Sequence, residues 1–215
     1  MNFLAHLLLG PHEAQQAVGS LLGDFVKGPM GSIELPRPVR EGIWLHRQVD
    51  GFTDRHELVL RSKARISPQR RRYAGIMVDM FYDHLLARHW QKFSRQTLDD
   101  FTEQMYQAVR AQQALLPERA KRVLLRMAQE DWLSSYAQLD SMHSALNNMS
   151  RRLRPGNTLA GSVHELEADY AGFEADFLEF MPLVISFARD SLRGENTRPE
   201  KVRQGVFFRE AGRQP

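Results

Sequence analysis

The sequence of 215 residues contains no cysteine. Disulfide bonds, thiolate nucleophiles and cysteine-ligated zinc or iron–sulfur sites are therefore excluded. The sequence also has no continuous run of the ~20 apolar residues that a membrane-spanning helix needs. Its first ten residues are apolar, but they lack the basic segment and the small-residue cleavage site of a signal peptide. These absences predict a cytoplasmic protein that does not insert into a membrane.

Short motifs of several enzyme classes are absent as well. The sequence has no G-x-S-x-G elbow, no Walker phosphate loop, no dinucleotide fingerprint and no H-E-x-x-H. Its net charge is only +3, from 29 Lys and Arg against 26 Asp and Glu. The chain is thus not a polycation, and its composition does not single out nucleic acid as a partner.

The apolar residues recur with helical spacing along nearly the whole chain, and no alternating strand pattern is present. We expect helices from about Val39 to Asp54, from about Arg70 to Trp90, and from about Thr158 to a kink or an end at Pro182. A further helical segment from about Pro117 to Asn148 is expected to break near Glu130. The sequence therefore predicts an all-α fold with a single helical domain over residues 1–193 and a polar tail over residues 194–215.

Histidines and aspartates lie on or beside the apolar faces of four expected helical segments. His46 and Asp50 share a stripe with Val39 and Ile43, since residues four apart lie on one helix face. In the helix expected from Arg70 to Trp90, His84 lies near the centre of the apolar stripe and Asp83 on its flank. Asp24 lies on the shoulder of an earlier helical segment that stops at Gly28 and Pro29, and His6 lies one turn after Phe3.

Burying such groups without partners would cost roughly several kcal/mol each. One divalent cation shared by several of them would offset that cost, and imidazole with carboxylate suits Mn²⁺, Mg²⁺, Fe or Zn²⁺. The competing interpretation is that these residues are scattered structural groups, as Asp54 would be if it paired with a surface arginine.

A metal site of this kind favours hydrolysis, because the ion lowers the pKa of bound water and polarises a phosphoryl oxygen. Lys27 follows Asp24 by three residues and Arg47 adjoins His46. Either cation could hold a phosphate, and arginine does so with a bidentate fork. Both are also ordinary surface residues in many proteins, so this role is a hypothesis.

Four segments, taken together and in order, resemble the acyl carrier protein phosphodiesterase family: "MNFLAHL" at the start, "GSLLGDFVKG", "GIWLHRQVDGFTDRH" and "MFYDHLLARHW". The resemblance implies an HD-phosphohydrolase-like helical domain with a divalent metal, favouring Mn²⁺. It also implies hydrolysis of the phosphodiester between 4′-phosphopantetheine and the serine of holo acyl carrier protein.

By position, the resemblance implies that Asp24, His46, Asp50, Asp83 and His84 form or support the metal site, with His6 as a further candidate. The doublet reads Asp-His, whereas the HD superfamily is named for His-Asp. Because acyl carrier proteins are strongly acidic, we expect a basic stretch to dock the carrier. Its residues are Arg61, Lys63, Arg65, Arg70, Arg71 and Arg72.

Two alternatives stay open at this point. The first is a related phosphohydrolase with the same metal site that acts on a small phosphoester or nucleotide. The second is a helical module without catalytic activity that binds an acidic partner or nucleic acid, for which no bound metal is expected.

Overall fold

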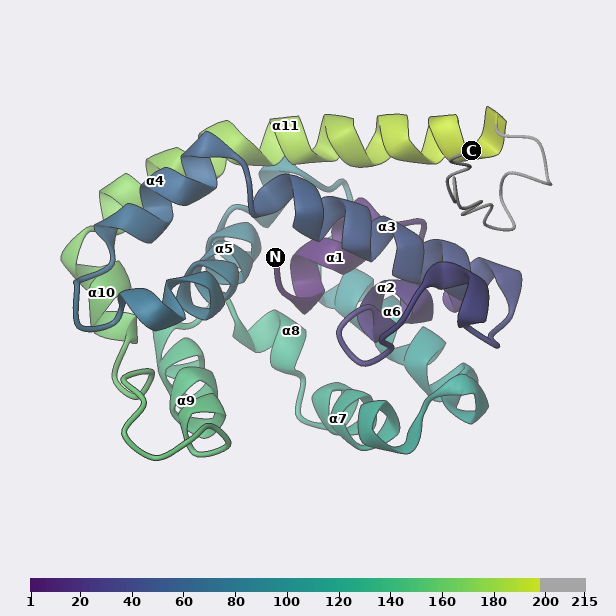
Figure 1. The fold of residues 1–215 in the computed structure, drawn as a ribbon, viewed down its shortest axis with the longest axis horizontal. Helices are drawn as coiled ribbons and strands as arrows, with labels where there is room; N and C mark the ends of the chain where they lie inside the picture. Colours follow the sequence, from purple (N-terminus) through teal and green to yellow (C-terminus); the bar gives the residue numbers. More distant parts are fainter. Residues whose placement is uncertain (198–215) are drawn as a thin grey trace, which may run out of the picture.

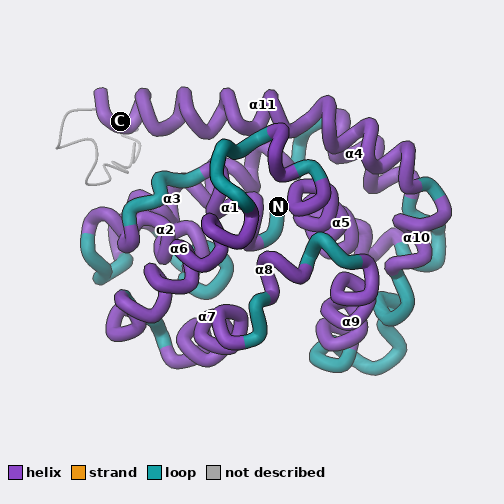
Figure 2. Tube along the Cα trace, turned by 180° about the vertical axis from the view of Figure 1, so that it is seen from behind, coloured by secondary structure: helices purple, strands orange, loops and turns teal. Residues whose placement is uncertain are grey.

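Residues 1–197 of the computed structural model consist of helices and loops, and no strand occurs in this part of the chain (Figures 1 and 2). Its α-helices are α1 (Phe3–Leu9), α2 (Ala14–Leu22), α3 (Arg37–Thr53), α4 (Glu57–Arg65), α5 (Ala74–Arg88), α6 (Leu98–Ala111), α7 (Glu118–Gln129), α8 (Trp132–Ser135), α9 (Leu139–Ser150), α10 (Val163–Ala168) and α11 (Tyr170–Thr197). Short 3₁₀ turns lie at Met30–Ser32, Arg71–Tyr73, Trp90–Lys92 and Gln113–Leu115. The all-α prediction is confirmed.

Local sequence explains where several helices begin and end. The hydroxyl of Thr97 accepts a hydrogen bond from the Asp100 backbone N–H at 3.1 Å and caps α6. Pro117 directly precedes α7, and Pro38 occupies the first turn of α3, where a missing N–H costs nothing. Asp131 has φ 47° and ψ 54°, a left-handed conformation that separates α7 from α8. The break predicted near Glu130 is therefore confirmed.

The amino-terminal half is built around the close pairing of α2 with α3. A Cβ on Gly19 would lie 2.2 Å from the Val39 carbonyl oxygen, and one on Gly42 would lie 2.2 Å from the Gln16 carbonyl oxygen. Only glycine permits this approach. α11 packs on both α3 and α4 and runs along one long edge of the molecule, while α7 and α9 lie at the opposite edge (Figure 1).

The carboxyl-terminal helices differ from the prediction. The helix expected from Thr158 is instead two helices, α10 and α11, because Asp169 leaves the helical conformation with φ −140° and ψ 46°. Pro182 lies inside α11, which continues to Thr197, beyond the predicted domain boundary at Arg193. The rest of the predicted tail lies outside the described residues.

None of the helices in residues 1–197 is long and apolar enough to cross a bilayer.

Candidate metal centre

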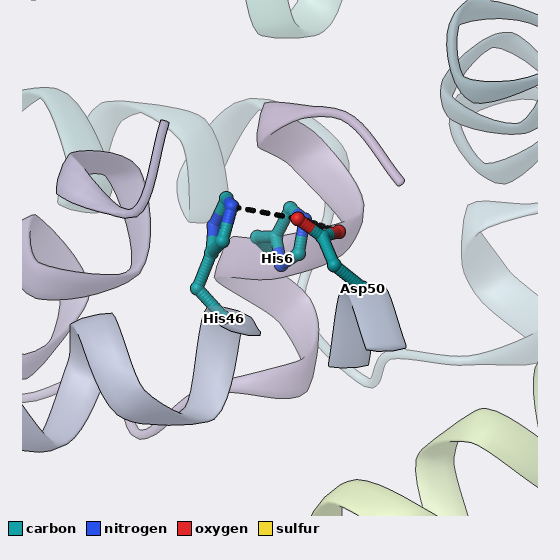
Figure 3. A group of neighbouring side chains, drawn as sticks. All are labelled: His6, His46 and Asp50. Atoms are coloured by element: carbon teal, nitrogen blue, oxygen red, sulfur yellow. Dashed lines mark ion pairs between the residues drawn. The ribbon is translucent and has the colours of Figure 1, made fainter. Parts of the chain in front are cut away.

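Two histidines and one aspartate from two helices meet in one place. His6 comes from α1, while His46 and Asp50 come from consecutive turns of α3 (Figure 3). One ligand atom from each of the three lies within 4.8 Å of the others. Both imidazoles are buried, with 2% of each residue exposed, whereas the Asp50 side chain is 38% exposed. The group is thus anchored in the interior and opens to solvent through its carboxylate.

The backbone of α2 fixes the orientation of His46. His46 Nδ1 lies 2.7 Å from the Ser20 carbonyl oxygen, and it must donate, since a carbonyl only accepts. A neutral His46 therefore presents its lone pair at Nε2, the arrangement usual for a metal-ligating histidine. Gly23 makes room for the ring, because a Cβ there would lie 2.2 Å from His46 Cγ and Cδ2.

Asp50 lies between the two imidazoles. Its Oδ1 is 3.1 Å from His6 Nε2 and its Oδ2 is 3.1 Å from His46 Nε2, as the dashed lines in Figure 3 show. The two rings stack with centroids 3.7 Å apart and an interplanar angle of 15°. Despite its proximity to Asp50, His6 Nε2 is buried and makes no hydrogen bond of acceptable geometry to any described residue. Such a nitrogen is able to bind a ligand that comes close to Asp50 as well.

Burial and charge set different protonation states for the two histidines. Burial, reinforced by His46, lowers the pKa of His6 to about 4. Burial also acts to lower the pKa of His46, but hydrogen bonds with Asp24 and Asp50 outweigh it and raise that pKa to about 9. Burial alone would raise the pKa of Asp50, yet its contacts with His46 and His6 hold it well below its usual range. The group therefore favours one positive charge between its carboxylates.

Asp24 lies at the edge of this group, just after α2. Its Oδ1 is 3.6 Å from His46 Nε2, and its side chain is 51% exposed. Partial burial opposes ionisation, but the hydrogen bond and charge of His46 lower the pKa of Asp24 below its ordinary value. Asp24 is therefore an ionised carboxylate facing both His46 and solvent.

The donor set fits a divalent cation. Two imidazole nitrogens and an ionised carboxylate are ligands for Mn²⁺, Fe²⁺ or Zn²⁺, and His6 Nε2 is buried without a hydrogen bond of good geometry. A dication would also supply the positive charge that a protonated His46 otherwise provides. These donors do not distinguish one divalent metal from another.

In residues 1–197, Asp83 and His84 lie outside the group formed by His6, His46 and Asp50. Asp83 is fully buried, and its oxygens accept the backbone N–H groups of Leu4 and Ala5 at 2.9 and 3.1 Å. It therefore caps the first turn of α1. Burial raises the pKa of Asp83 to about 7, although these two donors favour its charged form.

His84 is also engaged elsewhere. Its Nδ1 donates to the Tyr136 carbonyl oxygen at 2.8 Å, and its Nε2 lies 3.1 Å from the Tyr170 hydroxyl. Both ring nitrogens thus have partners within the fold, and the role of His84 as a ligand stays a prediction.

Of the two predicted phosphate-binding cations, Arg47 has a structural role. Its guanidinium donates to the carbonyl oxygens of Gly28 and Val26 at 2.7 and 2.8 Å and so holds the loop after α2. Lys27 is exposed on that loop, and its predicted role stays a prediction. The amino group of Met1, which sequence patterns did not reveal, lies 3.6 Å from Asp50 Oδ1 and 3.0 Å from Asp79 Oδ1.

The basic stretch expected to dock a partner is largely used inside the molecule. Arg61 and Arg65 bind the buried Asp176 of α11 with N–O distances of 2.6 and 2.9 Å. Lys63 pairs with Asp54 at 2.9 Å, and Arg70 with Glu165 at 3.4 Å. These contacts fasten α4 and the segment after it to their neighbours. Among the six predicted docking residues, Arg71 and Arg72 are the exposed ones without such an ion pair in residues 1–197.

The fold and this group define an all-α protein with a His/Asp site that fits a divalent cation. Residues 1–184 match the family described as "Acyl carrier protein phosphodiesterase". The chain belongs to that family, which confirms the resemblance seen in its sequence.

Curated proteins with the same name are similar over nearly their whole length. The protein of Yersinia enterocolitica is 36% identical over 192 residues, covering 88% of this chain and 98% of the relative. That of Serratia proteamaculans shows the same identity and coverage, and that of Pectobacterium atrosepticum is 35% identical over 191 residues, again covering 88% and 98%. No solved structure matches the chain. The predicted kinship with HD phosphohydrolases therefore stays a prediction.

Proposed function

We propose that this protein is a metal-dependent phosphodiesterase that releases 4′-phosphopantetheine from the serine of holo acyl carrier protein and leaves the apo carrier. Family membership supports the carrier as substrate. The observation that carries the chemistry is the convergence of His6, His46 and Asp50, with one imidazole nitrogen left without a hydrogen bond. A small phosphoester substrate and a non-catalytic module are the competing outcomes.

Three side chains would hold the ion: His6 and His46 through Nε2, and Asp50 through its carboxylate. When bound, a divalent ion lowers the pKa of coordinated water and polarises a phosphoryl oxygen. We assign it as Mn²⁺, the ion that the family resemblance favours, with Mg²⁺ or Fe as alternatives. The oxygen and nitrogen donors, without sulfur, suit all three. The Ser20 carbonyl keeps His46 in the tautomer that this task requires.

The remaining roles fall to residues at the open side of the group. The ionised Asp24 accepts a hydrogen bond from the attacking water and orients it. Lys27, exposed three residues further on, offers an ammonium to the phosphate oxygens. The water oxygen forms a bond to phosphorus, the bond from phosphorus to the serine oxygen breaks, and that oxygen leaves with a proton. We further propose that the reaction takes place in the cytoplasm.

Incubation of holo carrier protein with the purified enzyme tests the proposal. Mass spectrometry should show conversion to the apo carrier, EDTA should abolish it, and Mn²⁺ should restore it. His46→Ala and Asp50→Asn should each lower turnover at least 100-fold and reduce the bound metal. Asp54→Asn is the matched control, because Asp54 lies one turn after Asp50 but is 71% exposed and pairs with Lys63.

Each competing outcome has its own signature. Cleavage of a small aryl phosphodiester without any cleavage of holo carrier would favour the small-substrate phosphohydrolase. A preparation without bound metal, and without hydrolysis of either substrate after Mn²⁺ is added, would favour the non-catalytic module.

A further inference from the structure

One cavity is lined in part by Phe3 of α1, the helix that carries His6. It has a volume of about 550 Å³ and is enclosed by α7, α8 and α9, with α1 contributing one wall. In both views α8 lies between α7 and α9 and nearer the middle of the molecule than either of them (Figures 1 and 2). Its apolar lining comes from Phe3, Trp132, Ala145 and Met149, and its polar lining includes Ser141 and Asn148.

Phe3 connects this cavity to the metal centre. It precedes His6 by three residues on α1, so the two side chains are neighbours on one helix face, roughly 5–6 Å apart at Cβ. Phe3 also stacks on Phe25, with ring centroids 6.4 Å apart and an interplanar angle of 16°. Phe25 directly follows Asp24, and both aromatic side chains are partly exposed. A path over two aromatic rings thus leads from the cavity to Asp24.

The lining matches a particular kind of ligand. Cavities of about 300–1,000 Å³ with apolar walls and a few polar groups are typical sites for small organic molecules. Pantetheine is a slender chain with a branched apolar segment, a hydroxyl and two amides, and it carries no charge between its phosphate and its thiol. Serine hydroxyls and an asparagine amide can exchange hydrogen bonds with such amides, while Trp132 and Met149 cover the apolar segment.

We infer that this cavity receives the pantetheine arm of the holo carrier and so places the phosphodiester at the metal centre. This inference rests on the proposed function. The charges of the lining agree with it. Arg126 pairs with Glu130 at 2.8 Å, which leaves Arg151 and Arg152 against Asp140. A lining with a net positive charge suits an acidic carrier that stays outside while its arm enters.

The test fills the cavity from its α9 wall. Ala145→Trp should raise KM for holo carrier at least tenfold with a smaller change in kcat, and it should abolish the binding of free pantetheine measured by calorimetry. Asn148→Ala, which removes only one amide, should weaken pantetheine binding about threefold to tenfold. Ala111→Trp, at the exposed end of α6 and away from the cavity, is the control and should leave both values unchanged.

Metal content and thermal unfolding of each variant separate a blocked cavity from a damaged fold. If Ala145→Trp is folded, holds metal and retains its wild-type KM and pantetheine affinity, the assignment of the cavity is overturned and the proposed function stands. If the wild type does not cleave holo carrier at all, the proposed function fails. In that case, binding of pantetheine that Ala145→Trp abolishes would still support the ligand class of the cavity.

Discussion

His46 uses its two ring nitrogens for different purposes. Nδ1 is committed to the backbone of Ser20, and Nε2 faces two carboxylates. The same environment that favours a metal ion also favours a proton, because either one places a positive charge between Asp24 and Asp50. Competition between the proton and the metal is therefore built into this residue.

The protonation states predict how metal affinity depends on pH. In the metal-free protein His46 is protonated up to about pH 9, whereas His6 is already neutral above about pH 4. Metal binding at both Nε2 atoms must displace one proton, so affinity should rise about tenfold per pH unit from pH 6.5 to 8.5 and level off above pH 9. Calorimetry in buffers with different ionisation enthalpies should detect one released proton, and a pH-independent affinity would contradict this.

Gly23 gives a second prediction at this scale. In Gly23→Ala the new methyl group collides with the His46 ring, which must turn away from Asp50. Metal affinity should fall about 10–100-fold, as for the loss of an orienting partner of a ligand. Gly31→Ala is the control, because a Cβ at Gly31 has no heavy atom within 4 Å. Equal metal affinity in both variants would show that the ring adjusts without cost.

The sequence allowed part of this site to be predicted. The spacing of four between His46 and Asp50 placed both on the buried face of α3, and the first apolar segment carried His6. Asp83 and His84 were predicted in the same way but lie apart from this group. Helical periodicity gives the direction of a side chain from the axis of its own helix only. It does not show which helix lies opposite, and here Asp83 faces the start of α1 and His84 faces Tyr136 and Tyr170.

At the scale of the element, α1 depends on a partner outside itself. It has only seven residues, too few for a stable isolated helix, and its N-cap residue Asn2 makes no side-chain capping bond. Asp83 of α5 supplies the cap instead. Because α1 carries His6, the anchoring of this short helix and the geometry of the metal centre are linked.

Removing that cap should therefore affect both stability and the site. We expect Asp83→Ala to lower the free energy of unfolding by about 2 kcal/mol, since two buried N–H donors lose their acceptor. Metal affinity should fall as well, through displacement of His6. Asp83→Asn keeps one acceptor oxygen and should lose less of both. Chemical denaturation measures the stability and metal titration the affinity. Unchanged metal affinity in a destabilised Asp83→Ala variant would contradict the link between the cap of α1 and the metal centre.

At the scale of the whole molecule, positive charge divides into two kinds. Arg61, Lys63, Arg65 and Arg70 form ion pairs with acids of the same chain, whereas Arg151 and Arg152 line the cavity between α7, α8 and α9. The sequence shows both groups as basic clusters. It could not separate them, because the acids that bind Arg61, Arg65 and Arg70 lie on α10 and α11, about a hundred residues further along the chain.

Charge reversal at two surfaces tests which one faces the carrier. Arg151→Glu with Arg152→Glu should lower kcat/KM for holo carrier at least tenfold at low salt, and the loss should shrink as salt is added. Arg71→Glu with Arg72→Glu should cost less than threefold, since these residues do not line the cavity. Rates measured at several ionic strengths decide between them. A larger loss of kcat/KM from the Arg71 and Arg72 variant would instead indicate that the carrier docks on the basic stretch of residues 61–72.

The candidate centre brings together side chains of the first helix of the chain and the third, so a bound ion would also hold these two helices together. An ion held by His6 and His46 ties the opening segment to the body of the protein, so occupancy and attachment must rise and fall together. Removal of the ion by a chelator would favour detachment of this segment, which would then be cleaved more readily by proteases. Conversely, any agent that detaches this segment would release the ion and abolish the metal-dependent activity.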